Sequence, residues 1–129
     1  MAGHKGSKYY NIFLEQQVKL VSDGASIISE EGFRLLLEIE LRNSIVSAAK
    51  EMGISYRKAW GLLRDIERGL GFSLVGKQRG GRDGGRTIFT PEGKELLEAY
   101  KNLISELELS GKAPIRNFFR SINSISEKR

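Results

Sequence analysis

Residues 44–70 read SIVSAAKEMGISYRKAWGLLRDIERGL, a stretch that predicts two helices joined by a tight turn. Gly53 supplies the backbone freedom that a turn between crossing helices commonly needs. Ser55 follows at the position of an N-cap, where its hydroxyl can accept a hydrogen bond from an otherwise unpaired backbone N–H. The small pair Ala48 and Ala49 allows the second helix to cross close to the first. We therefore expect a helix-turn-helix around which the rest of the chain is organised.

The second of these helices has an apolar face and a basic face, at a helical advance of about 100° per residue. The apolar face is made by Ala59, Leu62, Leu63, Ile66 and Leu70. The opposite face carries Arg57, Gly61, Arg64 and Arg68. This layout suits a helix laid into the major groove of DNA, although helical hairpins with surface arginines are also common without that function.

Length and composition limit the classes of protein to which this chain can belong. The 129 residues suffice for one domain with a modest core. No stretch approaches the roughly 18 consecutive apolar residues of a membrane span, and the N-terminus lacks the apolar segment of a signal peptide. The absence of cysteine excludes disulfide scaffolds, thiol catalysis and zinc fingers, and the single histidine, His4, lies in a polar terminal segment. We expect a cytoplasmic protein with no membrane partner, no cofactor, no metal site and no enzymatic activity.

Basic charge is concentrated in one part of the chain. The formal net charge is +5, and the only acids between Arg57 and Arg86 are Asp65, Glu67 and Asp83. Acidic residues are frequent in the flanking helices instead. Such a distribution is typical of a nucleic-acid-binding surface, although many proteins of this net charge bind no polyanion.

The N-terminal part predicts a basic tail, a β-hairpin and a first helix. Residues 1–11 are expected to be disordered. Alternating apolar and polar residues over 12–21 predict a half-buried strand, and Asp23-Gly24 predicts the turn of a hairpin. Ser29 is the expected N-cap of a helix that ends near Leu41. That helix is apolar on nearly every side, so we expect it to be covered twice, by the core and by another element or subunit.

A second hairpin is expected after the helix-turn-helix. Two short β-type runs lie on either side of a glycine-rich loop, Gly80-Gly81-Arg82-Asp83-Gly84-Gly85. The basic residues of this hairpin are Lys77, Arg79, Arg82 and Arg86. The hairpin is therefore expected to be cationic where it is most exposed.

A long amphipathic helix is expected next. Thr90-Pro91-Glu92 provides an N-cap, a proline at the first helical position and an acid in the first turn. An apolar seam follows at spacings of four and three residues: Leu96, Tyr100, Leu103 and Leu107. Such a seam can pack within the chain or against a partner helix. Gly111 to Pro114 is expected to end the helix, and periodicity leaves open whether residues 115–125 form a short helix or a strand.

The expected order of elements is that of a winged helix-turn-helix, mainly α with small β, with an N-terminal β-hairpin and a long C-terminal dimerisation helix. The runs AAKEMGISYRKAW (48–60), GGRDGG (80–85) and TPEGKELLEAY (90–100) resemble the DNA-binding domain of ModE-type molybdate-responsive transcription regulators, which are similar to LysR-type DNA-binding domains. The resemblance covers residues 12–110. It implies a sequence-specific transcription regulator that binds double-stranded DNA as a homodimer.

The resemblance also implies roles for individual residues. The recognition helix would contact DNA through Ser55, Tyr56, Arg57, Lys58, Gly61 and Arg64. The glycine-rich hairpin, or wing, would contact the DNA backbone or minor groove through Lys77, Arg79, Arg82 and Arg86. The long helix would pair with its copy through Leu96, Tyr100, Leu103 and Leu107.

Base reading is expected mainly from the first two turns of the recognition helix. Arg57 is the first choice for a two-pronged contact with guanine, while Arg64 and Arg68 are expected to hold phosphates or nothing. The roles of two aromatic residues stay undecided between two alternatives each. Trp60 either packs in the core or contacts DNA or the wing, and Tyr56 either packs at the boundary or reaches the DNA.

Residues 111–129 form the expected C-terminal extension. The run IRNFFRSINSI (115–125) resembles the opening strand of the oxyanion-binding domains with which the family's regulators continue, but residues 126–129 are too few to complete such a domain. Molybdate is therefore not expected to bind this chain. The alternative function is a winged-helix module that binds protein or RNA without sequence-specific DNA binding.

Overall fold

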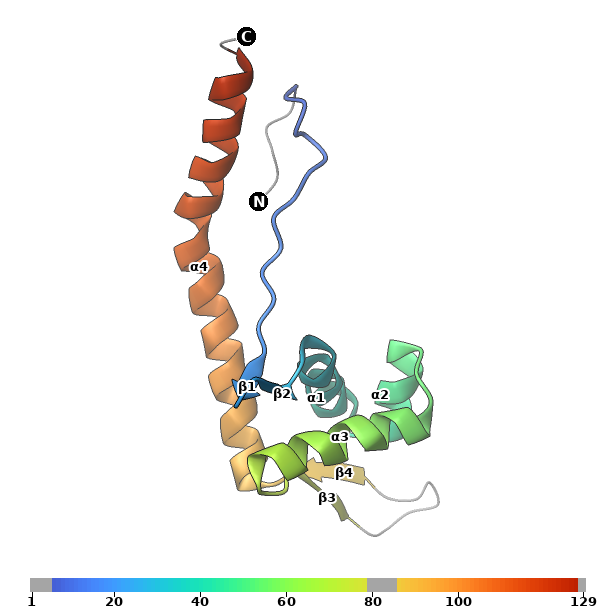
Figure 1. The fold of residues 1–129 in the computed structure, drawn as a ribbon. Coiled ribbons are helices and arrows are strands. Elements are labelled where there is room, and N and C mark those ends of the chain that lie inside the picture. The colour runs from blue at the N-terminus through green and yellow to red at the C-terminus, as the bar shows by residue number, and fades with distance from the viewer. Residues whose placement is uncertain (1–5, 79–85, 128–129) are drawn as a thin grey trace. The chain divides into compact units, whose positions relative to one another are not determined.

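The computed structural model describes residues 6–78 and 86–127 of the chain. These residues are mainly helical with two small β-hairpins, which confirms the expected fold class (Figure 1). The chain divides into two compact units, Gln17–Ala99 and a unit that joins Met1–Gln16 to Tyr100–Arg129. The expected domain boundaries after residues 11 and 110 remain predictions, because a compact unit is not yet an independently folding domain. Across the described part of the chain, no helix combines the length and apolar character needed to cross a membrane.

The first hairpin has the expected turn but shorter strands. Strand β1 (Leu20–Ser22) pairs antiparallel with β2 (Ala25–Ile28), and the turn between them has Asp23 at φ 49° and Gly24 at φ 78°. The expectation of a strand over all of residues 12–21 is wrong. Alternation of apolar and polar residues indicates which side of a strand would be buried. A strand also needs a neighbouring strand to pair with, and most of residues 12–21 have none.

Helix α1 (Glu30–Arg42) begins and ends at the expected signals. The Ser29 side chain accepts a hydrogen bond from the Gly32 N–H at 3.0 Å, and Asn43 at φ 53° donates its N–H to the Ile39 carbonyl. The helix contacts α2, α3, β2 and β4, which explains why nearly every side of it is apolar.

Replacing Ser29 with alanine is expected to lower the free energy of unfolding by about 1 kcal/mol, because the Gly32 N–H loses its acceptor. Denaturant titration of both proteins measures the change. A loss indistinguishable from zero would show that the cap contributes nothing to stability.

The helix-turn-helix is confirmed. Helix α2 (Ile45–Met52) ends at Gly53, whose φ is 69°, and α3 (Tyr56–Leu70) begins after Ser55. The Ser55 hydroxyl accepts a hydrogen bond from the Lys58 N–H at 3.0 Å, as an N-cap does. Ala48 and Ala49 are both buried, as expected for small residues where two helices cross.

The core of the Gln17–Ala99 unit is built from these helices and the residues that follow them. Its buried apolar residues are Ile28, Phe33, Leu35, Leu36, Ile39, Ile45, Ala48, Ala49, Ala59, Leu63, Ile66, Leu74 and Leu97. At the surface, Arg42 joins α1 to α2 by pairing with Glu38 at 2.8 Å and Glu51 at 3.2 Å. The hydrogen bond to Glu38 raises the pKa of the Arg42 guanidinium above its usual value.

The second hairpin is also confirmed. Strand β3 (Val75–Gln78) pairs antiparallel with β4 (Arg86–Phe89), with Val75 opposite Phe89 and Gln78 opposite Arg86. Its tip, residues 79–85, lies outside the described residues.

Helix α4 (Pro91–Glu127) starts as expected but does not end at Gly111 to Pro114. Thr90 accepts a hydrogen bond from the Gly93 N–H at 3.0 Å, which confirms the N-cap. The expected helix end is wrong, since the helix continues through Pro114, and residues 115–125 are helical. A proline inside a helix removes one backbone hydrogen bond and crowds the preceding turn, so packing elsewhere must offset that cost.

Packing of this kind is visible in the unit that joins Met1–Gln16 to Tyr100–Arg129. Phe119 is only 2% exposed, and the Ser7 hydroxyl donates a hydrogen bond to Asn123 Oδ1 at 2.9 Å. Residues 6–11 include a turn held by the Tyr10 N–H, which donates to the Ser7 carbonyl at 3.1 Å, and the expected disorder of residues 1–11 stays a prediction.

Candidate nucleic-acid interface

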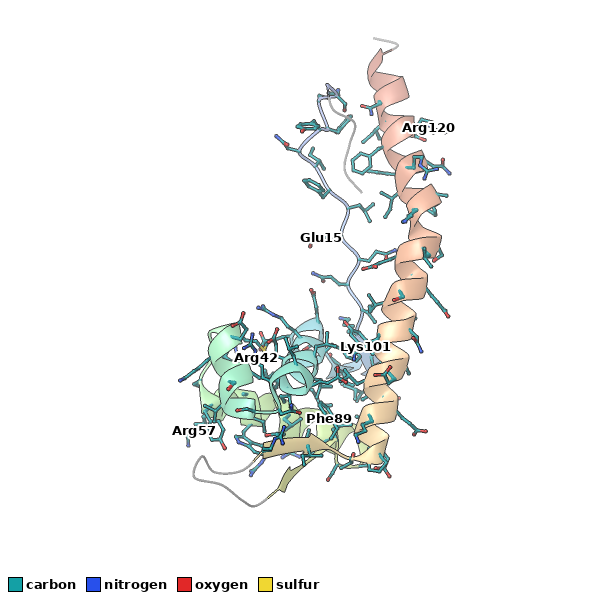
Figure 2. All side chains as sticks on the ribbon, turned by 180° about the vertical axis from the view of Figure 1, so that it is seen from behind. Glu15, Arg42, Arg57, Phe89, Lys101 and Arg120 are labelled. Atoms are coloured by element: carbon teal, nitrogen blue, oxygen red, sulfur yellow. The ribbon has the colours of Figure 1, made fainter. Side chains whose placement is uncertain are left out.

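Helix α3 turns its basic face outward and its apolar face inward, as its sequence predicts. Ala59, Leu63 and Ile66 are buried, and Leu62 and Leu70 are half-buried. The exposed residues of the other face include Arg57, Gly61, Arg64 and Arg68. Figure 2 shows Arg57 on the outer side of the helix, pointing away from the other helices.

The first turn of α3 is also open to solvent. Ser55, Arg57 and Lys58 are exposed, and Tyr56 is 46% exposed. The Lys58 ammonium lies 3.6 Å from Glu31 Oε1 of α1, but both side chains are about half exposed. A pair of that kind contributes little in water, so Lys58 can exchange it for a phosphate.

Tyr56, Trp60 and Arg64 form a surface cluster along α3. The Tyr56 and Trp60 rings meet edge to face with centroids 6.2 Å apart, and Arg64 Cζ lies 5.9 Å from the Trp60 ring centroid. Trp60 is half-buried, so its ring supports the exposed side chains on either side of it and is not sealed in the core.

Gly61 lies in the middle of this surface. A Cβ built on it would meet no heavy atom within 4 Å, and its backbone is exposed. Nothing in the described part of the fold requires a glycine there, although glycine costs roughly 1 kcal/mol relative to alanine inside a helix. Its lack of a side chain leaves a small opening on the exposed face of α3.

Replacing Gly61 with alanine is expected to raise the free energy of unfolding by roughly 0.5–1 kcal/mol, because the helix gains propensity and the new methyl group meets open space. The same change is expected to weaken duplex DNA binding if the helix backbone approaches the DNA at this point. Thermal unfolding and a duplex titration measure the two effects. Unchanged DNA binding would show that the opening has no part in recognition.

The wing is less completely described. Arg86 of β4 is exposed, Lys77 lies in β3, and Arg79 and Arg82 lie outside the described residues. The Thr87 N–H donates to the carbonyl of Asn43 at 3.1 Å, which ties β4 to the end of α1. The wing is therefore attached to the helical core and not only to the ends of its own loop.

Sequence reasoning missed two residues that hold the base of the wing. Glu67 of α3 accepts hydrogen bonds from the N–H groups of Leu74 and Val75, and Thr90 donates its N–H to the Leu74 carbonyl. Thr90 was expected only as a helix cap, and Glu67 only as one of a few acids in a basic region. No local pattern marks either bond, because the turn after α3 separates Glu67 from Leu74, and the whole β3–β4 hairpin separates Leu74 from Thr90.

The expected dimer residues lie along α4. Leu96, Tyr100 and Leu107 are half-buried and Leu103 is 39% exposed, while the neighbouring Leu97 is buried in the Gln17–Ala99 core. Their role in pairing with a second copy remains a prediction. Within the described ranges, no group of three His, Cys, Asp or Glu side chains is placed to hold a metal ion.

Comparison with curated proteins finds relatives among regulators and molybdenum-related proteins. The chain is 33% identical over 95 residues to the DNA-binding transcriptional dual regulator ModE of Escherichia coli (strain K12), covering 74% of this chain and 34% of that protein. It is 37% identical over 70 residues to the molybdenum-pterin-binding protein MopB of Rhodobacter capsulatus, covering 54% of this chain and 26% of that protein. The chain thus spans about a third of the length of the curated relatives that it matches first. No protein-family model matches it.

Comparison with solved structures finds the same fold. The BenM DNA-binding domain in complex with benA site 1 DNA superposes with a TM-score of 0.52 at 23% identity, covering 65% of this chain and 89% of that one. The CbnR DNA-binding domain in complex with DNA superposes with a TM-score of 0.51 at 21% identity, covering 69% of this chain and 93% of that one.

The fold is that of a winged helix-turn-helix domain, and the second helix of its helix-turn-helix exposes a basic face. More narrowly, the matched region is a ModE-like winged-helix DNA-binding domain, and the resemblance read from the sequence is confirmed.

Proposed function

We propose that this chain is a transcription regulator that binds double-stranded DNA in a sequence-specific manner, with α3 in the major groove and the β3–β4 hairpin on the adjacent backbone or minor groove. The observation that carries the proposal is the basic face of α3, which is exposed while its opposite face is buried. The similarity to the DNA-binding transcriptional dual regulator ModE of Escherichia coli supports it.

Different parts of this surface are assigned different tasks. Residues at the start of a recognition helix normally reach base edges, so Tyr56, Arg57 and Lys58 are the proposed readers, with Gly61 allowing close approach. Arg64, whose guanidinium lies beside Trp60, is the proposed phosphate contact. Ser55 holds the N-terminus of the helix and presents its hydroxyl at the same surface.

The wing is proposed to add affinity more than specificity. Lys77, Arg79, Arg82 and Arg86 would contact phosphates, and such contacts release counterions and weaken as the salt concentration rises. Arg86 is the wing cation whose exposure supports this most directly.

We further propose that the chain acts as a homodimer through Leu96, Tyr100, Leu103 and Leu107 of α4. Their spacing of four and three residues is that of a helix seam, and Leu103 is 39% exposed. A dimer would read two half-sites one or more helical turns apart. Molybdate is proposed not to bind this chain, because residues 115–125, compared above with the opening strand of a sensor domain, are helical.

A salt titration on duplex DNA tests the proposal. The dissociation constant of wild-type protein is measured by fluorescence anisotropy between about 50 and 200 mM salt, where six to ten phosphate contacts would weaken binding roughly 10³- to 10⁵-fold. A matched titration with single-stranded RNA distinguishes this function from the alternative, a winged-helix module that binds RNA or protein. If the wild-type protein binds no duplex at any of these salt concentrations, DNA binding is ruled out and a protein or RNA partner remains.

A further inference from the structure

The backbone of Leu74 is held from two directions at the base of the wing. Its N–H donates to Glu67 Oε2 of α3 at 2.6 Å, and the next N–H, that of Val75, lies 3.4 Å from the same oxygen. Its carbonyl accepts the Thr90 N–H at 2.9 Å. The Leu74 side chain is fully buried, so this point of the backbone has little freedom to move.

Glu67 differs in this respect from the other acid of α3. The Asp65 side chain is 74% exposed and pairs with Arg68 at 3.5 Å, so it lies on the outer surface. The Glu67 carboxylate instead turns toward the first residues of the wing. A short hydrogen bond to a carboxylate is stronger than one between neutral groups, which makes this bond a firm link between α3 and β3.

We propose that Glu67 is a positioning residue that fixes the β3–β4 hairpin relative to the DNA-facing side of α3, so that wing contacts with DNA depend on its carboxylate. The proposal rests on the proposed DNA-binding function. It adds that Glu67, an acid beside a basic surface, supports DNA binding by that surface, although the charge of its carboxylate alone would repel phosphates.

The two effects of Glu67 have opposite signs, which allows them to be separated. Removing an acid reduces repulsion and should strengthen binding, as Asp65→Ala is expected to do. Removing the link to Leu74 should release the wing and weaken binding. Glu67→Ala is therefore expected to bind duplex DNA more weakly than Asp65→Ala, although both lose the same charge.

The test combines a salt titration with double-mutant cycles. Arg86→Ala is expected to lower the slope of log K against log salt by about 1. Glu67→Ala is expected to lower it by at least as much, because the released wing carries Lys77, Arg79 and Arg82 besides Arg86. The Glu67→Ala, Arg86→Ala protein is expected to lower it by no more than Glu67→Ala alone. By contrast, the fold-losses of Glu67→Ala and Arg57→Ala are expected to multiply, because Arg57 does not depend on the wing.

Two further variants guard against a simple loss of fold. Glu67→Gln keeps an oxygen that can accept the Leu74 N–H and is expected to retain the wild-type slope. Glu67→Asp keeps the charge but shortens the reach, and it is expected to bind duplex DNA at least as weakly as Glu67→Ala. Hydrogen exchange of the Leu74 amide, which needs no DNA, should be faster in the Ala and Asp variants than in the Gln variant.

The outcomes distinguish the two proposals. If the wild-type protein shows no salt-dependent duplex binding, the proposed function fails and this inference falls with it. If the wild-type protein binds but Glu67→Ala matches Asp65→Ala in slope and couples equally to Arg86 and Arg57, Glu67 has no positioning role. Coupling to Arg86 alone, with rescue by Glu67→Gln, supports the role.

Discussion

Replacing Gly93 with alanine is expected to lower the free energy of unfolding by about 3 kcal/mol, in spite of the better helix propensity of alanine. A Cβ on Gly93 would overlap the carbonyl oxygen of Leu74 and would lie 3.0 Å from Phe89 Cδ1. The carbonyl is backbone and already accepts the Thr90 N–H, so it has no flexible end that could move aside. Denaturant titration followed by circular dichroism measures the loss.

Gly61→Ala is the matched control for this prediction, because it introduces the same methyl group into a helix where no atom lies within 4 Å. The two variants should therefore change the free energy of unfolding in opposite directions. Equal and small effects at both positions would show that the start of α4 is not closely packed against the base of the wing.

Arg57→Ala is expected to cost about 1–3 kcal/mol of discrimination at a single base pair, roughly 5- to 150-fold in relative affinity. Arg57 lies in the first turn of α3 and is exposed, where an arginine fork can reach guanine O6 and N7 in the major groove. Affinities for a selected duplex and for its single-base variants measure the effect. The loss should be confined to one position of each half-site.

Arg68→Ala provides the control for Arg57→Ala. Arg68 lies in the last turn of the same helix, its side chain is 79% exposed, and it pairs with Asp65. Removing it should weaken all duplexes alike or leave them unchanged. If Arg57→Ala behaves in the same way, Arg57 contacts phosphate and base reading must come from other residues.

The helix-turn-helix could be predicted from the sequence because its signals are local. Ser55 and Gly53 act on backbone groups within a few residues, and the two faces of α3 follow from helical periodicity alone. The same is true of the Asp23-Gly24 turn, whose residues both take positive φ.

Features that depend on distant residues could not be predicted in this way. Pro114 is a local signal for a helix end, but α4 continues through it, in a unit where Ser7 bonds to Asn123 across most of the chain. Glu67 and Asp65 are similar acids on one helix, and nothing in their spacing shows that only Glu67 bonds to the wing. Such contacts require the folded chain.

Methylation interference at guanine N7 tests most directly whether α3 enters the major groove. A duplex selected by the wild-type protein from random sequence is methylated sparingly at N7, and bound and free fractions are compared for wild-type protein and Arg57→Ala. We expect methylation at discrete guanines to block wild-type binding, and the block at one guanine per half-site to disappear with Arg57→Ala. Wild-type binding that is insensitive to N7 methylation at every guanine of the selected site would contradict the placement of α3 in the major groove.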